Sequence, residues 1–341
     1  MTRIAIVTDA WRPQVNGVVH TLERMSAAAR QQGADIAFVT PEGFATLPLP
    51  TYPEIRLAVP PRGEVGRRIE AIGADHVHIA TEGPLGFAAR RHCLAAGRVF
   101  TTSYHTRFPE YIRARLRLPE SWSYAALRRF HAPAAATLAP TPSMRDELRG
   151  RGFRNVATWT RGVDHALFAP GPGGALDLPR PIFLYVGRVA VEKNLEAFLE
   201  LSLPGSMAVV GDGPARAALA RKYGRAHFLG PRYGAALART YASADVFVFP
   251  SLSDTFGIVL IEALACGLPV AAFPVTGPID VIGQSGAGAL NRDLRVACFA
   301  ALGVSREAAR QHSLRYTWAE SARQFLRHVA ACRGANAGLA A

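Results

Sequence analysis

Short apolar runs alternate with longer amphipathic stretches along nearly the whole chain, and this alternation constrains the fold more than any other feature. Apolar runs of about four to six residues are typical of buried strands, and the amphipathic stretches between them are typical of helices. A regular succession of the two predicts parallel sheets with helices on both faces. In the first half, the expected strands are residues 3–8, 35–40, 76–79, 98–102, 136–139 and 155–159.

The strand pattern starts again in the second half, after residues 168–175, a segment so rich in proline and glycine that it is typical of a linker. We therefore predict an α/β chain with two doubly wound, Rossmann-like domains, residues 1–168 and 169–317, and a ligand cleft between the carboxyl ends of their strands. Residues 318–341 are expected to begin as a helix and to pack back on the first domain. The expected strands of the second domain are 182–186, 207–210, 227–229, 245–249 and 270–273, and the clearest helices are 18–31, 195–201, 214–223 and 258–266.

The chain is strongly basic, with 39 Lys and Arg residues, 26 Asp and Glu residues and a formal net charge of +13. Lys193 and Lys222 are its only lysines. Guanidinium groups suit bidentate contacts with phosphate, so an anionic ligand or surface is expected. No apolar run approaches the ~20 residues that span a bilayer, and the first one is too short for a signal peptide. With four scattered cysteines that lack metal-site spacing, the chain is expected to be cytoplasmic.

Residues 249–270 contain the most informative motif, because an expected strand, a polar loop and an expected helix follow one another. Asp254 lies on the loop, and Glu262 lies inside the helix. The backbone N–H groups of Phe256, Gly257 and Ile258 stand at the helix N-terminus, which favours an anion. Glu262 is then placed to bind a vicinal diol such as a ribose. The alternative is an ordinary capped helix with an exposed Glu262.

A second motif, residues 186–194, places cations around a strand-to-helix turn. Gly187 and Arg188 come at the end of an expected strand, and Lys193 comes where the next helix begins. Two cations in such a turn suit a diphosphate and would stabilise a departing nucleotide. A surface arginine and a lysine paired with Glu192 remain the alternative.

Two further residues of the first half follow expected strands. Gly17 stands at a loop-to-helix junction, where it allows close approach of a phosphate or sugar, although most such turns use glycine structurally. His105 closes the fourth strand and is expected to face the cleft, whereas an isolated histidine is more often a satisfied core residue.

Taken together, these motifs resemble the retaining glycosyltransferases of family GT4, which have the GT-B fold. The resemblance runs from about residue 3 to 284. It implies that Asp254 contacts the donor sugar, Glu262 the nucleotide ribose, Arg188 and Lys193 the diphosphate, and His105 the donor sugar. Glutamate is usual at the position of Asp254, and asparagine is common at that of Arg161. Gly213 and Leu229 resemble the family's positions near the nucleotide, Leu229 where the backbone meets the base.

The resemblance is nearest to a bacterial subgroup of GDP-mannose-dependent α-mannosyltransferases and diacylglycerol glycosyltransferases. Its marks are residues 8–18, 80–86, 103–111 and 253–257. It implies transfer from a UDP-sugar or GDP-mannose to a lipid such as diacylglycerol, or mannosyl transfer to a glycolipid or polysaccharide precursor. No Asp-x-Asp motif occurs, so we expect no metal and no other cofactor.

Residues 107–118 interleave arginines with large apolar residues, and Trp122, Tyr124, Leu127 and the pair Arg128–Arg129 follow. Such a mixture without a spanning segment fits an interfacial surface on anionic lipid, at the inner face of the cell membrane. The alternative is a solvated helix whose apolar face packs in the domain.

Two other classes of protein are weighed against a transferase. The positive charge also suits a nucleic-acid-binding protein, but the arginines are dispersed and no recognition motif occurs, so no nucleic-acid partner is expected. A sugar-nucleotide epimerase or a phosphorylase on the same scaffold is the other alternative, since fold does not determine function.

Overall fold

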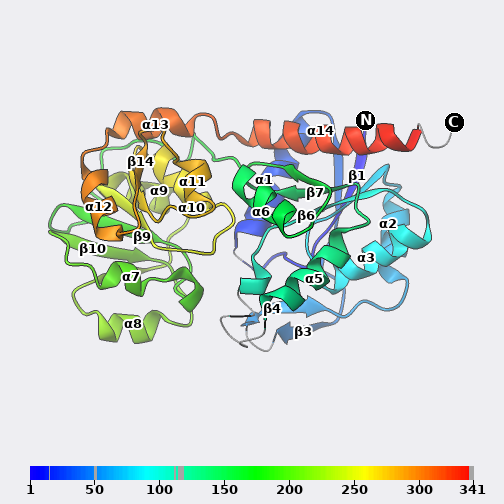
Figure 1. Cartoon of the computed structure of the whole chain (residues 1–341), viewed down its shortest axis with the longest axis horizontal. Helices are drawn as coiled ribbons and strands as arrows, with labels where there is room; N and C mark the ends of the chain where they lie inside the picture. Colours follow the sequence, from blue (N-terminus) through cyan, green and yellow to red (C-terminus); the bar gives the residue numbers. More distant parts are fainter. Residues whose placement is uncertain (15, 50–51, 111–112, 114–118, 338–341) are drawn as a thin grey trace. The chain divides into compact units, whose positions relative to one another are not determined.

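The computed structural model describes residues 1–14, 16–49, 52–110, 113 and 119–337, and these form two compact units (Figure 1). Unit 1 contains the chain up to Arg161 and again from Trp318 onwards, and unit 2 runs from Gly162 to Thr317. The first division therefore falls before the glycine- and proline-rich segment in which the linker was expected.

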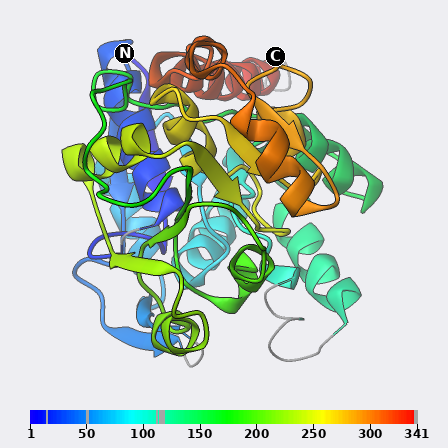
Figure 2. The ribbon, with the colours of Figure 1, turned by 90° about the vertical axis from the view of Figure 1, so that its left-hand side faces the viewer.

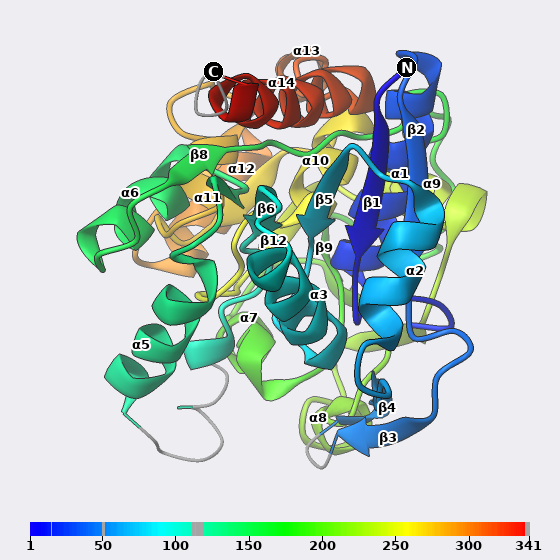
Figure 3. The same cartoon turned by 90° about the vertical axis from the view of Figure 1, so that its right-hand side faces the viewer.

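Unit 1 is built on a six-stranded parallel sheet in the order β2-β1-β5-β6-β7-β8 (Figure 3). The central strands are fully buried, as expected for a sheet covered on both faces. An antiparallel hairpin, β3 (Thr46–Leu49) with β4 (Tyr52–Ala58), stands apart from this sheet. The strands of the sheet are β1 (Arg3–Val7), β2 (Asp35–Val39), β5 (His76–Ile79), β6 (Phe100–Ser103), β7 (Ala136–Ala139) and β8 (Val156–Thr158).

The C-terminal helix α14 (Trp318–Ala337) packs against α1 (Gly17–Gln31) within unit 1 (Figure 1). Its Phe325 joins the core that contains Trp159. The indole N–H of Trp159 donates to the Ser321 carbonyl oxygen at 3.0 Å, so the helix satisfies a buried polar group of this core. The other helices of the unit are α2 (Glu64–Ile72), α3 (Pro84–Ala95), α5 (Glu120–His131) and α6 (Pro142–Gly150).

Unit 2 repeats the plan with a second six-stranded parallel sheet, in the order β11-β10-β9-β12-β13-β14; its ribbon runs from green to orange in Figure 2. Its strands are β9 (Ile182–Val186), β10 (Ser206–Val210), β11 (His227–Gly230), β12 (Val246–Phe249), β13 (Val270–Ala272) and β14 (Gly288–Leu290). Its helices are α7 (Glu196–Leu199), α8 (Arg216–Lys222), α9 (Gly234–Ser243), α10 (Ile258–Ala265), α11 (Pro278–Val281), α12 (Leu294–Leu302) and α13 (Arg306–Ser313), with a 3-10 turn at Val191–Lys193.

The prediction of two doubly wound domains is confirmed, and each expected strand is present to within two residues at its ends. The β3–β4 hairpin and β14 were not predicted. Both lack a long apolar run, and β14 is only three residues long, so the pattern of buried strands misses them. The helix expected at 195–201 is shorter than predicted, because α7 spans only Glu196–Leu199.

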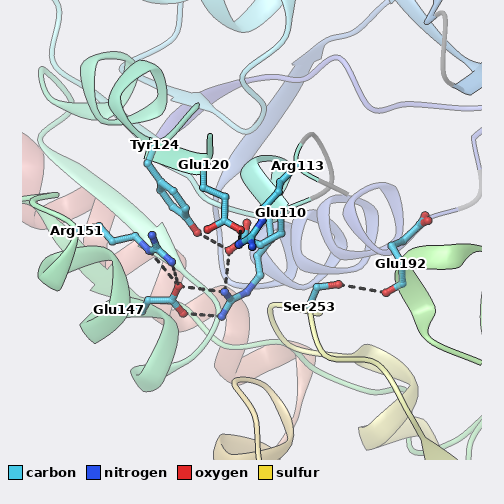
Figure 4. A network of polar contacts seen from close by, with 9 residues as sticks. Glu110, Arg113, Glu120, Tyr124, Glu147, Arg151, Glu192 and Ser253 are labelled. Carbon is cyan, nitrogen blue, oxygen red and sulfur yellow. Dashed lines mark hydrogen bonds and ion pairs between the residues drawn. The ribbon is translucent and has the colours of Figure 1, made fainter. Parts of the chain in front are cut away.

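A buried ionic network ties α6 to the segment after β6 (Figure 4). Arg107 is 8% exposed and donates to both carboxylate oxygens of Glu147, at 3.0 and 2.6 Å, and to Glu110 at 3.0 Å. Tyr124 of α5 donates to Glu110 at 2.6 Å, and Arg151 lies 3.8 Å over the Tyr124 ring. The guanidinium of Arg107 therefore neutralises two carboxylates that are themselves mostly buried.

We expect Arg107→Met to lower the free energy of unfolding by about 3 kcal/mol, because it leaves Glu147 and Glu110 without their shared cation. The matched control is Arg145→Met on α6, the helix that carries Glu147; its pair with Asp146 is exposed, so its loss of stability should be clearly smaller than that of Arg107→Met. Urea denaturation measures both. A loss for Arg107→Met no larger than that of the control would contradict the assigned role.

Candidate functional site

The predicted site residues of unit 2 lie on loops at the point in the sheet where the order of successive strands changes direction. Strands β9 and β12 are neighbours at the centre of the sheet, while the connections from β9 lead outward on one side and those from β12 on the other. In open parallel sheets, the loops that leave the carboxyl ends of such a strand pair diverge and leave a crevice for a ligand. Residues 187–194 follow β9, and residues 250–257 follow β12.

Three contacts join these two loops. The Lys193 ammonium lies 2.5 Å from a carboxylate oxygen of Asp254. The Asn194 amide donates to the Pro250 carbonyl oxygen at 3.0 Å, and the Ser253 hydroxyl donates to the Glu192 carbonyl oxygen at 3.2 Å (Figure 4). One ion pair and two hydrogen bonds to backbone carbonyl oxygens therefore fix the position of the two loops relative to each other.

The predicted Lys193 and Asp254 thus pair directly, and the predicted Arg188 lies on the same loop as Lys193. Lys193 and Asp254 are about four-fifths buried, and Arg188 lies 4.0 Å from Glu192. The second carboxylate oxygen of Asp254, Oδ2, is buried and accepts no hydrogen bond from the part of the chain that the structure describes. A buried acceptor without a donor is costly in a folded protein, so Oδ2 is suited to receive a hydrogen bond from a bound molecule.

The N-terminus of α10 follows Asp254 closely in the chain and presents backbone donors. Within the described residues, the N–H groups of Phe256, Gly257 and Ile258 donate to no backbone carbonyl, and no side chain caps the helix. The Phe256 side chain is buried in the core, so only its backbone can meet a ligand. Gly257 has a φ of 81°, which only glycine adopts readily. The arrangement suits an anionic group.

Two glycines allow the loops after β9 and β10 to pass close to other groups. A Cβ on Gly187 would lie 2.7 Å from the Tyr185 hydroxyl oxygen, and a Cβ on Gly213 would lie 2.4 Å from the Val189 carbonyl oxygen. Both have a φ of 154°. Glycine at these positions is therefore required by the protein's own packing. Leu229, the remaining predicted residue of this unit, is half-buried on the edge strand β11.

Glu262 is buried rather than exposed, which removes the alternative of a solvated helix residue. It is 8% exposed, and one of its carboxylate oxygens accepts from the Tyr241 hydroxyl at 3.1 Å. Burial raises the pKa of Glu262 to about 7, although the hydrogen bond from Tyr241 opposes the shift. The charge on this carboxylate therefore changes near neutral pH.

Gly17 and His105 belong to unit 1. Gly17 begins α1, where the Asn16 side chain already accepts from the N–H groups of Val18 and Val19, both at 3.0 Å. His105 follows β6, and its Nδ1 lies 3.1 Å from the guanidinium of Arg161. Both arrangements are made entirely by residues of unit 1.

Sequence patterns did not predict the contacts that several residues make in these groups. Tyr241 binds Glu262, Asn194 and Ser253 join the two loops, and Arg161 contacts His105. Asn194 had one usable signal, because it directly follows the predicted Lys193. Tyr241 and Arg161 are far from their partners in the chain, so no local pattern could find them. Within the described residues, no group of three or more His, Cys, Asp and Glu side chains is arranged to hold a metal ion.

Comparison with known proteins supports this picture. Residues 15–167 match the family model described as Glycosyltransferase Family 4, and residues 180–302 match the model described as Glycosyl transferases group 1. A GDP-mannose-dependent alpha-mannosyltransferase of Mycobacterium tuberculosis is 31% identical over 82% of this chain and 81% of its own. A sulfoquinovosyl transferase of Arabidopsis thaliana is 29% identical over 80% of this chain and 60% of its own.

Among solved structures, HepE of Anabaena in complex with UDP and glucose matches with a TM-score of 0.73. It is 15% identical and covers 97% of this chain and 100% of its own, so the likeness is one of fold. Two parallel-sheet units of this kind form the GT-B fold. The chain thus belongs to glycosyltransferase family 4 and is a glycosyltransferase of the GT-B fold.

Proposed function

We propose that this enzyme transfers a hexose or hexuronic acid, with retention of configuration, from a UDP-sugar or GDP-mannose to a membrane lipid such as diacylglycerol. The observation that carries the proposal is the ion pair and the hydrogen bonds that hold the loops after β9 and β12 together. These two loops carry Arg188, Lys193, Asp254 and the backbone amides at the N-terminus of α10. The relatives support it, because one is named for its GDP-mannose donor and another for sulfoquinovosyl transfer.

In this proposal, each of these groups has one task. Arg188 and Lys193 bind the diphosphate and stabilise the negative charge that grows on it as the sugar leaves. Asp254 receives hydrogen bonds from sugar hydroxyls through Oδ2, and the amides at Phe256, Gly257 and Ile258 add donors for an anion. Glu262 binds the ribose. His105 contacts the donor sugar. Gly17, Gly187 and Gly213 allow the donor to approach the backbone closely, and the backbone of Leu229 contacts the nucleotide base.

We also propose that transfer needs no metal ion or other cofactor. Two side-chain cations and a helix N-terminus supply the positive charge that a divalent ion provides in other phosphoryl-binding sites. Turnover of the purified enzyme in EDTA is the corresponding check.

Replacing both diphosphate ligands tests the central claim. We expect the double variant Arg188→Ala, Lys193→Ala to lose at least about 10³-fold in kcat/KM, because removing one preorganised charge or donor typically costs about 10²–10³. Transfer of radiolabelled sugar to lipid measures the rate, and thermal unfolding confirms that the variant is folded.

The matched control is Arg221→Ala, Lys222→Ala on α8, which removes the same charge from the same unit at exposed positions. The control should keep its activity within about threefold. Wild-type rates in a folded Arg188, Lys193 variant would eliminate the proposal.

Glu262 makes nucleotide binding depend on pH. Since burial raises its pKa to about 7, we expect the donor to bind most tightly above pH 7 and progressively more weakly as the carboxylate becomes protonated below it. Glu262→Gln should weaken binding about tenfold at pH 8 and remove this dependence. Isothermal titration with UDP and GDP across this range measures both effects.

The same variant should be more stable than the wild type at pH 8. The folded pKa of Glu262 lies above its unfolded value of 4.5, so deprotonation costs folding free energy as the pH rises from 4.5 through about 7. Glu262→Gln removes this cost, which is on the order of 2 kcal/mol. A variant that binds as tightly as the wild type, or gains no stability at pH 8, would contradict the buried carboxylate's role.

Mannosyl transfer from GDP-mannose to a glycolipid or polysaccharide precursor is the second candidate. It is favoured by the 31% identity to the mycobacterial mannosyltransferase over most of both chains. A thermal-shift screen of UDP, GDP and their sugars, with and without diacylglycerol micelles, separates the candidates. A ligand that binds the native state raises the melting temperature, so the nucleotide and the acceptor that raise it most identify the preferred base and acceptor.

We propose peripheral binding to anionic lipid, at the inner face of the cell membrane, for the acceptor reaction. Trp122, Arg128 and Arg129 of α5 are exposed and support it, as does Phe108. Tyr124 and Arg107 are buried in the ionic network, so they are excluded from such a surface. Residues 111, 112 and 114–118 of the expected patch lie outside the described residues. Within the described chain, no helix has the length and apolar character that crossing a bilayer requires.

Vesicle sedimentation tests the surface. We expect Trp122→Gln combined with Arg128→Gln and Arg129→Gln to weaken binding to vesicles with anionic lipid by at least about tenfold, since each cation near such a surface contributes about 1 kcal/mol. The control is Val191→Ser, which removes an exposed apolar residue from unit 2. Wild-type binding that ignores both salt and anionic lipid content would remove the membrane proposal.

A further inference from the structure

Arg161 is a buried cation, and among the described residues no ion pair explains its position. It is 3% exposed, and its guanidinium lies 4.4 Å over the Trp159 ring. One terminal nitrogen donates to the carbonyl oxygens of Trp159 at 2.7 Å and Thr160 at 3.4 Å. Burial lowers the pKa of Arg161 to about 9, and no carboxylate of the described residues offsets this. A charge held at such a cost calls for a specific task.

The other terminal nitrogen of Arg161 points to that task. It lies 3.1 Å from Nδ1 of His105. A guanidinium carries only N–H donors and no acceptor, so Nδ1 must be the acceptor in this hydrogen bond. A neutral imidazole carries one proton, and with Nδ1 unprotonated that proton is on Nε2.

The surroundings of His105 keep the ring neutral. Two cationic or titratable neighbours act on it, Arg161 on the segment after β8 and His78 on β5, and both lower its pKa. His78 is itself engaged on both nitrogens, by the hydroxyls of Thr101 at 2.8 Å and Ser103 at 2.9 Å. Burial, then Arg161, then His78 lower the pKa of His105 well below its usual value.

We propose that Arg161 is a positioning residue that fixes His105 as a neutral Nε2–H donor. A histidine held in this form gives a hydrogen bond to an oxygen of the donor sugar and does not take a proton from the acceptor. The sugar contact rests on the function proposed above, whereas the tautomer rests on unit 1 alone. Arg161 thereby assigns His105 to recognition rather than to general base catalysis.

The tautomer is measured directly by NMR of the full chain labelled with ¹⁵N-histidine. The His105 signals are identified by their loss in His105→Gln. In the wild type we expect Nδ1 unprotonated and Nε2 protonated throughout the neutral pH range, without titration. In kinetics, log kcat/KM should show no limb from His105 over the same range.

Three substitutions of Arg161 separate the hydrogen bond from the charge. Arg161→Gln keeps an N–H donor without the cation, so the tautomer should persist while the pKa of His105 rises. Arg161→Met removes both, so His105 should populate both tautomers and its pKa should rise. Arg161→Lys restores a charged donor and should return both properties toward the wild type. The matched control is Arg90→Met, which also removes an arginine that donates to two backbone carbonyls of unit 1, at 2.9 and 3.0 Å.

A wild-type His105 protonated on Nδ1, or an Arg161→Met variant with unchanged tautomer and titration, would overturn the proposal. Equal changes in Arg90→Met would also overturn it, because they would reflect general loosening of unit 1. Failure of the proposed transferase chemistry would appear instead as absent sugar transfer in the wild type, with the NMR result intact.

Discussion

The ion pair between Lys193 and Asp254 is the interaction on which the rest of the site depends. It joins the loop after β9 to the loop after β12 at the one place in the sheet of unit 2 where the connections diverge. Two backbone-directed hydrogen bonds, from Asn194 and Ser253, hold the same pair of loops. The charges are therefore in place before any ligand arrives. Preorganised charge of this kind needs no rearrangement during the reaction, which is why it is effective in catalysis.

In unit 1, several polar side chains are buried in the middle of the parallel sheet. His76 and His78 of β5 share the Thr101 hydroxyl of β6, and Ser103 completes the row. These four side chains satisfy one another across the two strands, which lowers the cost of burying them. His105 comes two residues after Ser103, and Arg161 provides the hydrogen-bond partner for its Nδ1. A neutral, oriented histidine is the product of this arrangement.

The large arginine content has a partly internal explanation. Arg30, Arg149 and Arg310, like Arg161, donate to backbone carbonyl oxygens at the ends of strands, helices and loops. Guanidinium groups suit this task because they present several donors in a fixed plane. Arg107 acts similarly for two carboxylates. The net charge therefore describes both internal scaffolding and an outer surface, and composition cannot separate the two.

Sequence alone determined the features that depend on neighbours in the chain. Alternating apolar runs specify buried parallel strands, since each strand is a local run of apolar residues, and the order of Gly187, Arg188, Lys193, Asp254 and Glu262 identified the family. Tertiary structure alone decided which groups meet. The pairing of Lys193 with Asp254, the burial of Glu262 beneath Tyr241 and the contact of Arg161 with His105 join residues that are between 21 and 61 positions apart. Protonation states depend on such distant partners and on burial, because both act through space rather than along the chain.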